Sequence, residues 1–353
     1  MNTRSLLVLL GVLGVGVGVG VVVSPTGEAT DPMLDLLQVV FFDVGQGDSA
    51  VLITPEPDRK VIIIDGGFVN TARASIVPFL ESQNITTVDL MILTHPDMDH
   101  VSGLREIMRE LDVSEIWDPG FDGDTQTYQN FETEAQAEAG DRYYAPLEDQ
   151  IVADVSLDTD DVAERRIVIG QPETFDGLQI IPLHTDDFLD GPTHAYDVNN
   201  SSIVVKVVFG ENSILFTGDA NGRGNNASPE ETETNGPFFT EAALLQVEAA
   251  SPGILQSTVL KAPHHGSLTS SSTQFLEKVR PQWVVISSGV TNSNLPRPAT
   301  LTRYSDLKAN ILRTDVLDQS DTKGDDHLVL IMGRDEGNLI WRQTNSLIPD
   351  VEE

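Results

Sequence analysis

The stretch Thr94-His95-Pro96-Asp97-Met98-Asp99-His100 carries the strongest indication of fold and chemistry in this chain. It follows directly on segment 89–93, which is Asp89 followed by four apolar residues. Those apolar residues predict a buried strand, so the stretch lies where that strand ends. Four of its side chains, two imidazoles and two carboxylates, can bind metal ions and fall within six residues. Two divalent ions held close together would account for this density, and such pairs of ions catalyse hydrolysis. The alternative is an acidic loop in an already acidic protein.

Further groups of this kind follow other predicted strands. Asp219 ends the segment Phe216-Thr217-Gly218-Asp219, His264 and His265 lie in Lys261-Ala262-Pro263-His264-His265-Gly266-Ser267, and Asp65 begins Asp65-Gly66-Gly67. Ligands of open α/β sheets bind beyond the carboxyl ends of the strands. We therefore expect these groups to share one site, although Asp65 and Asp219 would also suit plain turns.

The spacing suggests how two ions would be shared. His95 and Asp97 are two residues apart, so they face the same side of an extended segment and suit one metal. Asp99 and His100 suit a second metal, which one of His264 and His265 would complete. Asp219 would bridge the two ions. The histidine left over, or a water bound to metal, would protonate the leaving group.

Composition describes the environment of the protein and little of its fold. The chain has 353 residues, 55 Asp and Glu against 21 Lys and Arg, a formal net charge of -34 and 40% hydrophobic residues. The hydrophobic content is sufficient for a packed core. The acidic side chains on the surface repel one another unless salt shortens the Debye length, which is about 3 Å at molar concentration. We interpret the charge as adaptation to high salt, with an ordinary acidic protein as the alternative. The chain has no Cys, which excludes disulfides, thiolate ligands and a Cys nucleophile.

The chain divides into four predicted parts. Residues 1–25 contain the apolar run 6–23 with Arg4 before it, which indicates a signal peptide or a membrane-anchoring helix. A linker at 26–35 precedes one hydrolase-like domain at 36–345, and 346–353 form a tail. The leader predicts an extracytoplasmic protein, secreted or anchored in the membrane.

Within the domain, strands and helices alternate, which is typical of the α/β class. We predict strands at residues 36–42, 49–54, 61–64, 89–93, 113–117, 178–183, 202–209, 213–217, 257–261, 283–287, 328–332 and 338–342. Helices are expected at 73–83, at 102–111 with Ser102 as N-cap, at 127–139 and at 239–250. Residues 118–170 are acidic and weakly periodic and are interpreted as an insertion facing the substrate.

These segments resemble the metallo-β-lactamase superfamily, in the branch similar to the soluble hydrolase domain of the ComEC/Rec2 DNA-uptake proteins. The resemblance covers roughly residues 36–340. It implies a four-layer αββα sandwich with a dinuclear site at one edge, and metal-activated water that attacks an ester, most often a phosphodiester. The segments that carry it are Phe42-Asp43-Val44-Gly45-Gln46-Gly47-Asp48-Ser49, Asp65-Gly66-Gly67, residues 94–100, Asn199-Asn200-Ser201-Ser202, residues 216–219 and His264-His265-Gly266-Ser267.

Two positions differ from the wider superfamily. Asp97 stands where many members have His, and Asn199 and Asn200 occupy the region that usually donates a further His. Oxygen ligands favour Mn²⁺ or Mg²⁺ over Zn²⁺. We expect two divalent ions, which are Mn²⁺ or Zn²⁺, with Mg²⁺ as a further candidate. Asn199 and Asn200 are candidate metal or substrate ligands.

The resemblance also implies supporting residues. The turn Gly45-Gln46-Gly47-Asp48 lies near the site in the family and could offer N–H groups to an anion. Lys261 would help to hold a phosphate, or would simply be exposed. The expected supporting residues are Asp43, Gln46, Asp48, Asp65 and Lys261. His184, His194 and His327 lack supporting neighbours and are left out of the site.

The function expected from these observations is that of an exported metal-dependent hydrolase, a phosphodiesterase or a nuclease. DNA is the substrate that the family suggests, but the chain shows no basic stripe, so a small phosphoester is an alternative. A non-catalytic binding or scaffold module on the same fold is the rival from another class. Nothing in the sequence indicates a protein partner.

Overall fold

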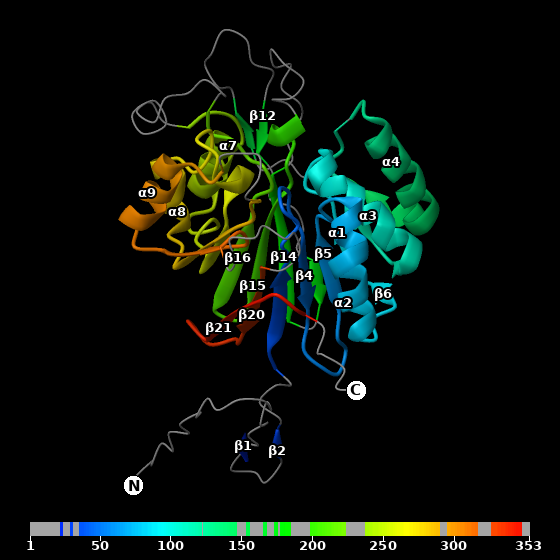
Figure 1. Ribbon diagram of the computed structural model, residues 1–353. Helices are drawn as coiled ribbons and strands as arrows, with labels where there is room; N and C mark the ends of the chain where they lie inside the picture. The colour runs from blue at the N-terminus through cyan, green and yellow to red at the C-terminus, as the bar shows by residue number, and fades with distance from the viewer. Residues whose placement is uncertain are drawn as a thin grey trace.

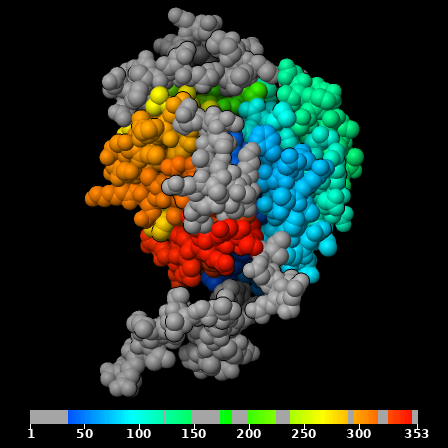
Figure 2. Space-filling model, viewed as in Figure 1, coloured from blue at the N-terminus to red at the C-terminus, as the bar shows by residue number. Residues whose placement is uncertain are grey.

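The computed structural model describes residues 22–23, 29–30, 35–121, 123–146, 153–155, 165–167, 173–175, 177–184, 198–223, 237–289, 295–316 and 326–347. Two large sheets lie face to face at its centre, with helices outside each of them (Figure 1). Figure 2 shows the same division on the surface, with residues 35–146 in blue to green on one side and the orange residues around α9 on the other.

The first sheet contains eight strands in the order β10-β9-β7-β5-β4-β3-β20-β21. Its middle strands β5, β7 and β9 run parallel, whereas β3, β4, β20 and β21 pair antiparallel. The strands are β3 (Leu37–Phe41), β4 (Ala50–Ile53), β5 (Val61–Ile64), β7 (Leu90–Ile92), β9 (Ile116–Trp117), β10 (Tyr143–Tyr144), β20 (His327–Met332) and β21 (Leu339–Thr344).

The second sheet contains seven strands in the order β13 to β19, antiparallel as far as β16 and parallel from there on. They are β13 (Glu173–Phe175), β14 (Leu178–His184), β15 (Val204–Phe209), β16 (Asn212–Phe216), β17 (Val259–Lys261), β18 (Trp283–Ile286) and β19 (Asn310–Arg313). Short pairs of strands lie outside these sheets: β1 (Val22–Val23) with β2 (Ala29–Thr30), β6 (Thr87–Val88) with β8 (Asp112–Val113), and β11 (Ala153–Val155) with β12 (Arg165–Ile167).

Three apolar layers hold this arrangement together. The central strands read as continuous apolar runs because both of their faces are covered. Val39, Phe41 and Leu52 face the second sheet, whereas Val40 and Val51 face the helices on the outside. A third cluster, which includes Leu215 and Phe275, joins the second sheet to its own helices. The predicted αββα sandwich is confirmed.

The layer between the sheets contains an aromatic pair close to the functional end. The rings of Phe41 and Phe216 stack with centroids 5.8 Å apart and an interplanar angle of 26°. Phe41 ends β3 and Phe216 ends β16, so the pair sets the spacing between the two sheets just before the loops that leave them.

The helices on the first sheet are α1 (Val69–Thr71), the π-helical turn η1 (Ala72–Ile76), α2 (Val77–Ser82), α3 (Met98–Glu110) and α4 (Gln126–Ala139). The helices on the second are α7 (Phe239–Ala250), α8 (Thr273–Val279) and α9 (Pro298–Asp306), and the 3₁₀ turns are η2 (Gly140–Arg142) and η3 (Pro263–Gly266). Part of the predicted insertion is thus ordered, because Arg105 of α3 donates two hydrogen bonds to Glu134 of α4, at 2.9 and 2.7 Å.

The predicted start of α3 at Ser102 is wrong. Asp97 has the extended backbone of an N-cap, with φ -69° and ψ 148°, so the helix begins at Met98. The Ser102 hydroxyl instead donates to the Met98 carbonyl, 2.5 Å away, within the helix. Asp99 and His100 consequently lie in the first helical turn, which fixes their directions more firmly than a loop would.

The predicted apolar helix before the domain is not supported. Residues 1–21 lie outside the described residues, and the end of the apolar run, Val22–Val23, is a short strand paired with Ala29–Thr30. Among the described residues, no helix combines the length and apolar character needed to cross a membrane.

Two glycines bring α3 against the turn that follows β5. A Cβ atom on Gly103 would lie 1.9 Å from the carbonyl oxygen of Gly66, and one on Gly66 would lie 2.3 Å from the Leu104 nitrogen. The Gly66 amide donates to the His100 carbonyl at 2.8 Å, and the Gly103 amide donates to the Gly67 carbonyl at 2.9 Å. This close approach places the first turn of α3 directly beside Asp65.

We expect Gly103→Ala to lower the free energy of unfolding by about 1–3 kcal/mol, because overpacking against backbone outweighs a helix-propensity gain of roughly 1 kcal/mol. Urea denaturation in high salt measures the change. Glu110→Ala is the matched control, since it adds alanine at an exposed position of the same helix. Equal stability of both variants would contradict the close contact.

Candidate metal centre

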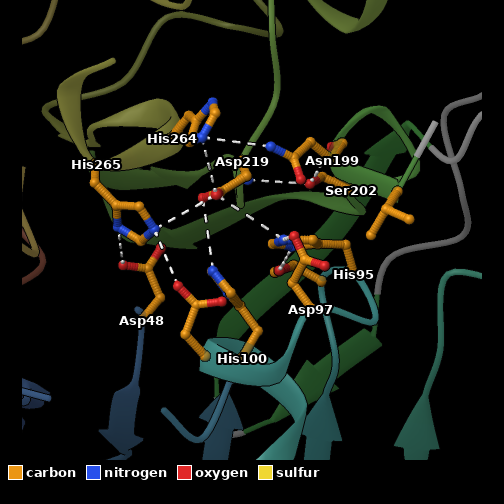
Figure 3. Close-up of polar contacts among 12 residues, drawn as sticks. Asp48, His95, Asp97, His100, Asn199, Ser202, Asp219, His264 and His265 are labelled. Carbon is orange, nitrogen blue, oxygen red and sulfur yellow. Dashed lines mark hydrogen bonds and ion pairs between the residues drawn. The ribbon is translucent and has the colours of Figure 1, made fainter. Parts of the chain in front are cut away.

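The chemical groups predicted from the sequence meet where parallel strands of both sheets end (Figure 3). In the first sheet, β5 leads to Asp65 and β7 leads to His95, with Asp99 and His100 in the helical turn that follows. In the second sheet, β16 leads to Asp219 and β17 leads to the histidine pair. Each sheet therefore contributes about half of the site.

Asp219 lies in the middle of the imidazoles (Figure 3). Its carboxylate oxygens lie 3.4 Å from His265 Nε2, 3.7 Å from His100 Nε2 and 4.0 Å from His95 Nε2. The Asp219 side chain is 6% exposed, and both histidines closest to it are at most 1% exposed. Three ring nitrogens thus converge on one buried carboxylate from two sheets.

Asp65 orients the two histidines of the first sheet. Its carboxylate accepts hydrogen bonds from His100 Nδ1 at 2.9 Å, from the Thr94 hydroxyl at 2.7 Å and from the Thr94 amide at 2.8 Å. The Thr94 oxygen also contacts His95 Nδ1 at 3.1 Å. Because the Nδ1 of His100 donates to Asp65, its Nε2 is the nitrogen that faces the centre and can offer a lone pair to a metal ion once its proton is released.

His265 is fixed in the same way by the second sheet. Its Nδ1 lies 3.1 Å from the Ser287 carbonyl, which can only accept, so Nε2 is again left to face the centre. Asp48 Oδ1 lies 3.5 Å from the same Nδ1. His265 Nε2 lies 3.9 Å from Asp99 Oδ2, which brings the α3 carboxylate to this side of Asp219.

Lys261 lies behind the site, so the alternative of an exposed Lys261 is wrong. Its residue is 3% exposed, and its ammonium group donates to Asp48 Oδ2 at 2.7 Å and to the Ala262 carbonyl at 3.1 Å. The lysine therefore balances the Asp48 carboxylate, and nothing in this geometry directs it to a phosphate.

The donor set fits divalent metal ions. Among the described residues, buried atoms without a hydrogen-bond partner include His95 Nε2, His100 Nε2, His265 Nε2 and Asp219 Oδ1. Leaving several buried polar atoms unpaired is costly, and native proteins rarely do so without a reason. Ligand atoms of His95, His100 and Asp219 lie within 4.8 Å of one another, as do those of Asp99, His100 and His265. Imidazole and carboxylate ligands suit first-row divalent ions.

Electrostatics supports the same conclusion. Burial alone would lower the pKa of the His100 imidazole, but the carboxylates of Asp65 and Asp219 outweigh it and raise that pKa to about 10. Against its own burial, the pKa of His265 is raised well above its ordinary value by Asp219 and Asp48. Protons on the imidazoles thus compensate the buried carboxylates, and metal binding releases such protons because the ligands must be deprotonated.

Asp97 lies at the open side of the centre. Its side chain is 45% exposed, and its Oδ2 lies 3.6 Å from His95 Nε2. Burial opposes its ionisation, but the nearby imidazoles of His95 and His100 outweigh burial and lower the pKa of the carboxyl. Asp97 and His95 therefore face the same side, as their spacing predicts.

His264 and His265 point to different partners. Both have left-handed backbones, with φ of 46° and 53°. His264 Nδ1 donates to Asn221 Oδ1 at 2.9 Å, and its Nε2 lies 3.4 Å from Asn199 Nδ2 and 3.7 Å from Asp219 Oδ2. With 20% of its side chain exposed, His264 is placed at the rim, whereas His265 is placed among the buried ligand atoms.

The remaining predicted residues lie around the centre and not in it. Asn200 Oδ1 accepts a hydrogen bond from the backbone N–H of Asn221 at 3.3 Å and one from the Thr240 hydroxyl at 3.0 Å. The Asn200 side chain thus connects neighbouring loops. Asp43 accepts from the Gly45 amide at 2.9 Å and shapes the turn before Asp48. None of the described contacts joins the Gln46 side chain to the histidines.

His327 lies outside the site and supports the turn that contains Asp43. Its Nδ1 accepts a hydrogen bond from the Asp43 amide at 3.0 Å, on the far side of that turn. The His184 and His194 side chains lie outside the described residues.

Sequence reasoning overlooked three polar residues that hold the ligands. Thr94 links Asp65 to His95, and Ser202 accepts from the Asp219 amide at 3.0 Å while it donates to the Asn199 carbonyl at 2.7 Å. Asn221 fixes His264. Thr94 and Ser202 lie within the motif segments, so their proximity to ligands was the available signal.

Comparisons with known proteins agree with this geometry. The family model described as "Metallo-beta-lactamase superfamily" matches residues 43–289. "ComE operon protein 3" of Bacillus subtilis (strain 168) is 25% identical over 293 residues, which cover 79% of this chain and 32% of that protein. "Competence protein ComA" of Neisseria gonorrhoeae is 28% identical over 280 residues, covering 79% and 31%.

The predicted resemblance to the ComEC/Rec2 branch is thereby confirmed. The chain spans about a third of the length of these curated relatives. Among solved structures, a diphosphatase described as from the PhnP family has a TM-score of 0.38 at 12% identity, covering 84% of this chain and 99% of that one.

We expect Asp65→Asn to weaken Mn²⁺ binding about 10- to 100-fold, because an amide has one acceptor oxygen and its NH2 group would face either the Thr94 amide or the donors Thr94 Oγ1 and His100 Nδ1. Isothermal titration calorimetry on protein stripped with a chelator measures the affinity. Asp89→Asn is the control, since Asp89 flanks the amino end of β7 and pairs with Lys60 at 2.8 Å. Unchanged affinity in Asp65→Asn would exclude the orienting role.

Proposed function

The chain belongs to the metallo-beta-lactamase superfamily, and from that premise we propose that it is a metal-dependent hydrolase that cleaves phosphodiester bonds. One observation carries the proposal above all others. Imidazole nitrogens and a carboxylate oxygen from two sheets converge in a buried space, and among the described residues they have no hydrogen-bond partner. A merely structural arrangement would pair such atoms with each other.

Two divalent ions fit the donor set. His95 and Asp97 would hold one, Asp99, His100 and His265 would hold the other, and Asp219 lies between both groups. When bound, such a pair of ions supplies an activated water and stabilises negative charge on phosphoryl oxygens. The carboxylate share of the ligands favours Mn²⁺ or Mg²⁺ over Zn²⁺.

The protein itself would orient the histidine ligands, balance the charge of the buried carboxylates and transfer a proton to the leaving group. Asp65 and the Ser287 carbonyl hold the Nδ1 sides of His100 and His265, so that both Nε2 atoms face inward. His264, held by Asn221 at the rim, would give a proton to the leaving oxygen, with a metal-bound water as the alternative donor. Asn199 can hydrogen-bond His264 or an oxygen of the substrate.

DNA is the substrate that the ComEC/Rec2 resemblance suggests, and a smaller phosphodiester is the alternative. The net charge of -34 works against a long polyanion, because little counterion release is available to such a surface. Since the chain spans about a third of its curated relatives, their whole activity is not assumed for it.

We further propose that the protein acts outside the cytoplasm in concentrated salt. The apolar run at residues 6–23 and the excess of acidic residues support this. The intact mass of protein isolated from its native cells is the measurement. We expect either a mature chain without the leader or a full-length chain in the membrane fraction. Full-length protein in the soluble cytoplasmic fraction would contradict export.

We expect Asp99→Ala to lower kcat on bis-p-nitrophenyl phosphate with Mn²⁺ at least about 100-fold, since a lost ligand removes several kcal/mol of charge stabilisation. The measurement is p-nitrophenolate release in molar salt, with circular dichroism as the check on folding. Asp306→Ala, at an exposed position of α9, is the matched control. A wild-type protein that binds Mn²⁺ but cleaves no diester would favour the binding-module alternative.

His264→Ala should separate substrates by their leaving groups. A sugar alkoxide needs a proton, so we expect a loss of about 10²- to 10⁴-fold on a dithymidine phosphodiester. A p-nitrophenolate leaves without one, so the aryl diester should lose less than about tenfold. Product formation by chromatography compares the two. Equal losses on both substrates would show that His264 acts in another way.

A further inference from the structure

Two exposed apolar side chains flank the metal centre. Among the described residues, the large hydrophobic side chains that are exposed include Met98 at 53% and Phe238 at 47%. Met98 lies between the ligand candidates Asp97 and Asp99. Phe238 immediately precedes α7. Of the two, Phe238 presents an aromatic ring on which a planar group of a ligand could stack.

The position of Phe238 is fixed relative to the centre by backbone. Its amide donates to the Gly222 carbonyl at 2.8 Å, and Gly222 follows Asp219 by three residues, which is at most about 11 Å of chain. The first turn of α7 is held as well, since the Thr240 hydroxyl donates to Asn200 Oδ1 at 3.0 Å. Phe238 therefore lies on the His264 side of the rim.

One face of the Phe238 ring already carries a cation. The guanidinium carbon of Arg223 lies 4.5 Å from the ring centroid, and Arg223 is only 5% exposed. The residue is nevertheless 47% exposed, and its other described ring contact is with Phe239, whose centroid lies 6.5 Å away at an interplanar angle of 59°. The next residue, Phe239, has a φ of 52°, a strained value for a bulky side chain.

We propose that Phe238, backed by Arg223, forms a stacking subsite for a planar aromatic group, such as a nucleobase, attached to the phosphodiester that the centre cleaves. The assignment of the phosphodiester rests on the proposed function. Stacking on an aromatic ring tolerates high salt, whereas contacts with exposed lysines are screened. In a chain with a net charge of -34, stacking offers affinity that a basic surface cannot.

The test compares two esters that share one leaving group. Thymidine 5′-p-nitrophenyl phosphate carries a base, and methyl p-nitrophenyl phosphate does not. We expect Phe238→Ala to raise KM for the thymidine ester about 5- to 150-fold, the range for one stacked base, and to leave KM for the methyl ester within about twofold. Phe238→Trp should retain the preference. Ile340→Ala, another exposed apolar position at 61%, is the matched control.

Binding without turnover separates this proposal from the proposed function. Calorimetry with the Mn²⁺-loaded protein compares the affinities for thymidine 5′-monophosphate and methyl phosphate. It is run in 0.5 M and in 3 M salt, at which the Debye length is longer and shorter, respectively, than its value of about 3 Å at 1 M. Tighter binding of the nucleotide, lost in Phe238→Ala, supports the subsite even if neither ester is cleaved. Equal affinities for both phosphates, or an unchanged preference in Phe238→Ala, would overturn it.

Discussion

The hydrogen bonds of the buried Asp65 carboxylate are the interaction on which the rest of this site depends. Asp65 holds the Thr94 amide, the Thr94 hydroxyl and His100 Nδ1 at once, and through Thr94 it reaches His95. It thereby joins the end of β5, the end of β7 and the first turn of α3. The contact between Gly66 and Gly103 is what permits this, because any Cβ atom there would push the helix away.

The centre also shows how an acidic protein keeps a defined charge arrangement inside. Its surface carboxylates repel one another and face water, whereas Asp48, Asp65 and Asp219 are buried beside cations or imidazoles. Lys261 compensates Asp48, and the imidazoles of His265 and His100 compensate Asp219. A buried carboxylate is tolerated only with such partners, and the partners are of the kind that metal ions replace.

The strands and the sandwich could be predicted because apolar runs and turn residues are local patterns, and the motif at residues 94–100 indicated the chemistry. The start of α3 could not, because the N-cap role of Asp97 depends on its extended backbone. The choice between His264 and His265 depends on left-handed angles that non-glycine residues seldom adopt. The burial of Lys261 and the bracing by Ser202 arise from contacts between distant segments, which no local pattern contains. The helices α8 and α9 were missed although both begin with local signals, the N-cap Ser272 and Pro298.

The stacked rings of Phe41 and Phe216 have a consequence for metal selectivity. Each ring ends a strand whose following loop carries part of the centre, Asp48 in one sheet and Asp219 in the other. The size of this aromatic pair therefore affects the distance between the loop that carries Asp48 and the loop that carries Asp219. Substitutions that change ring volume there would retune the distance between the two halves without touching a single coordinating atom.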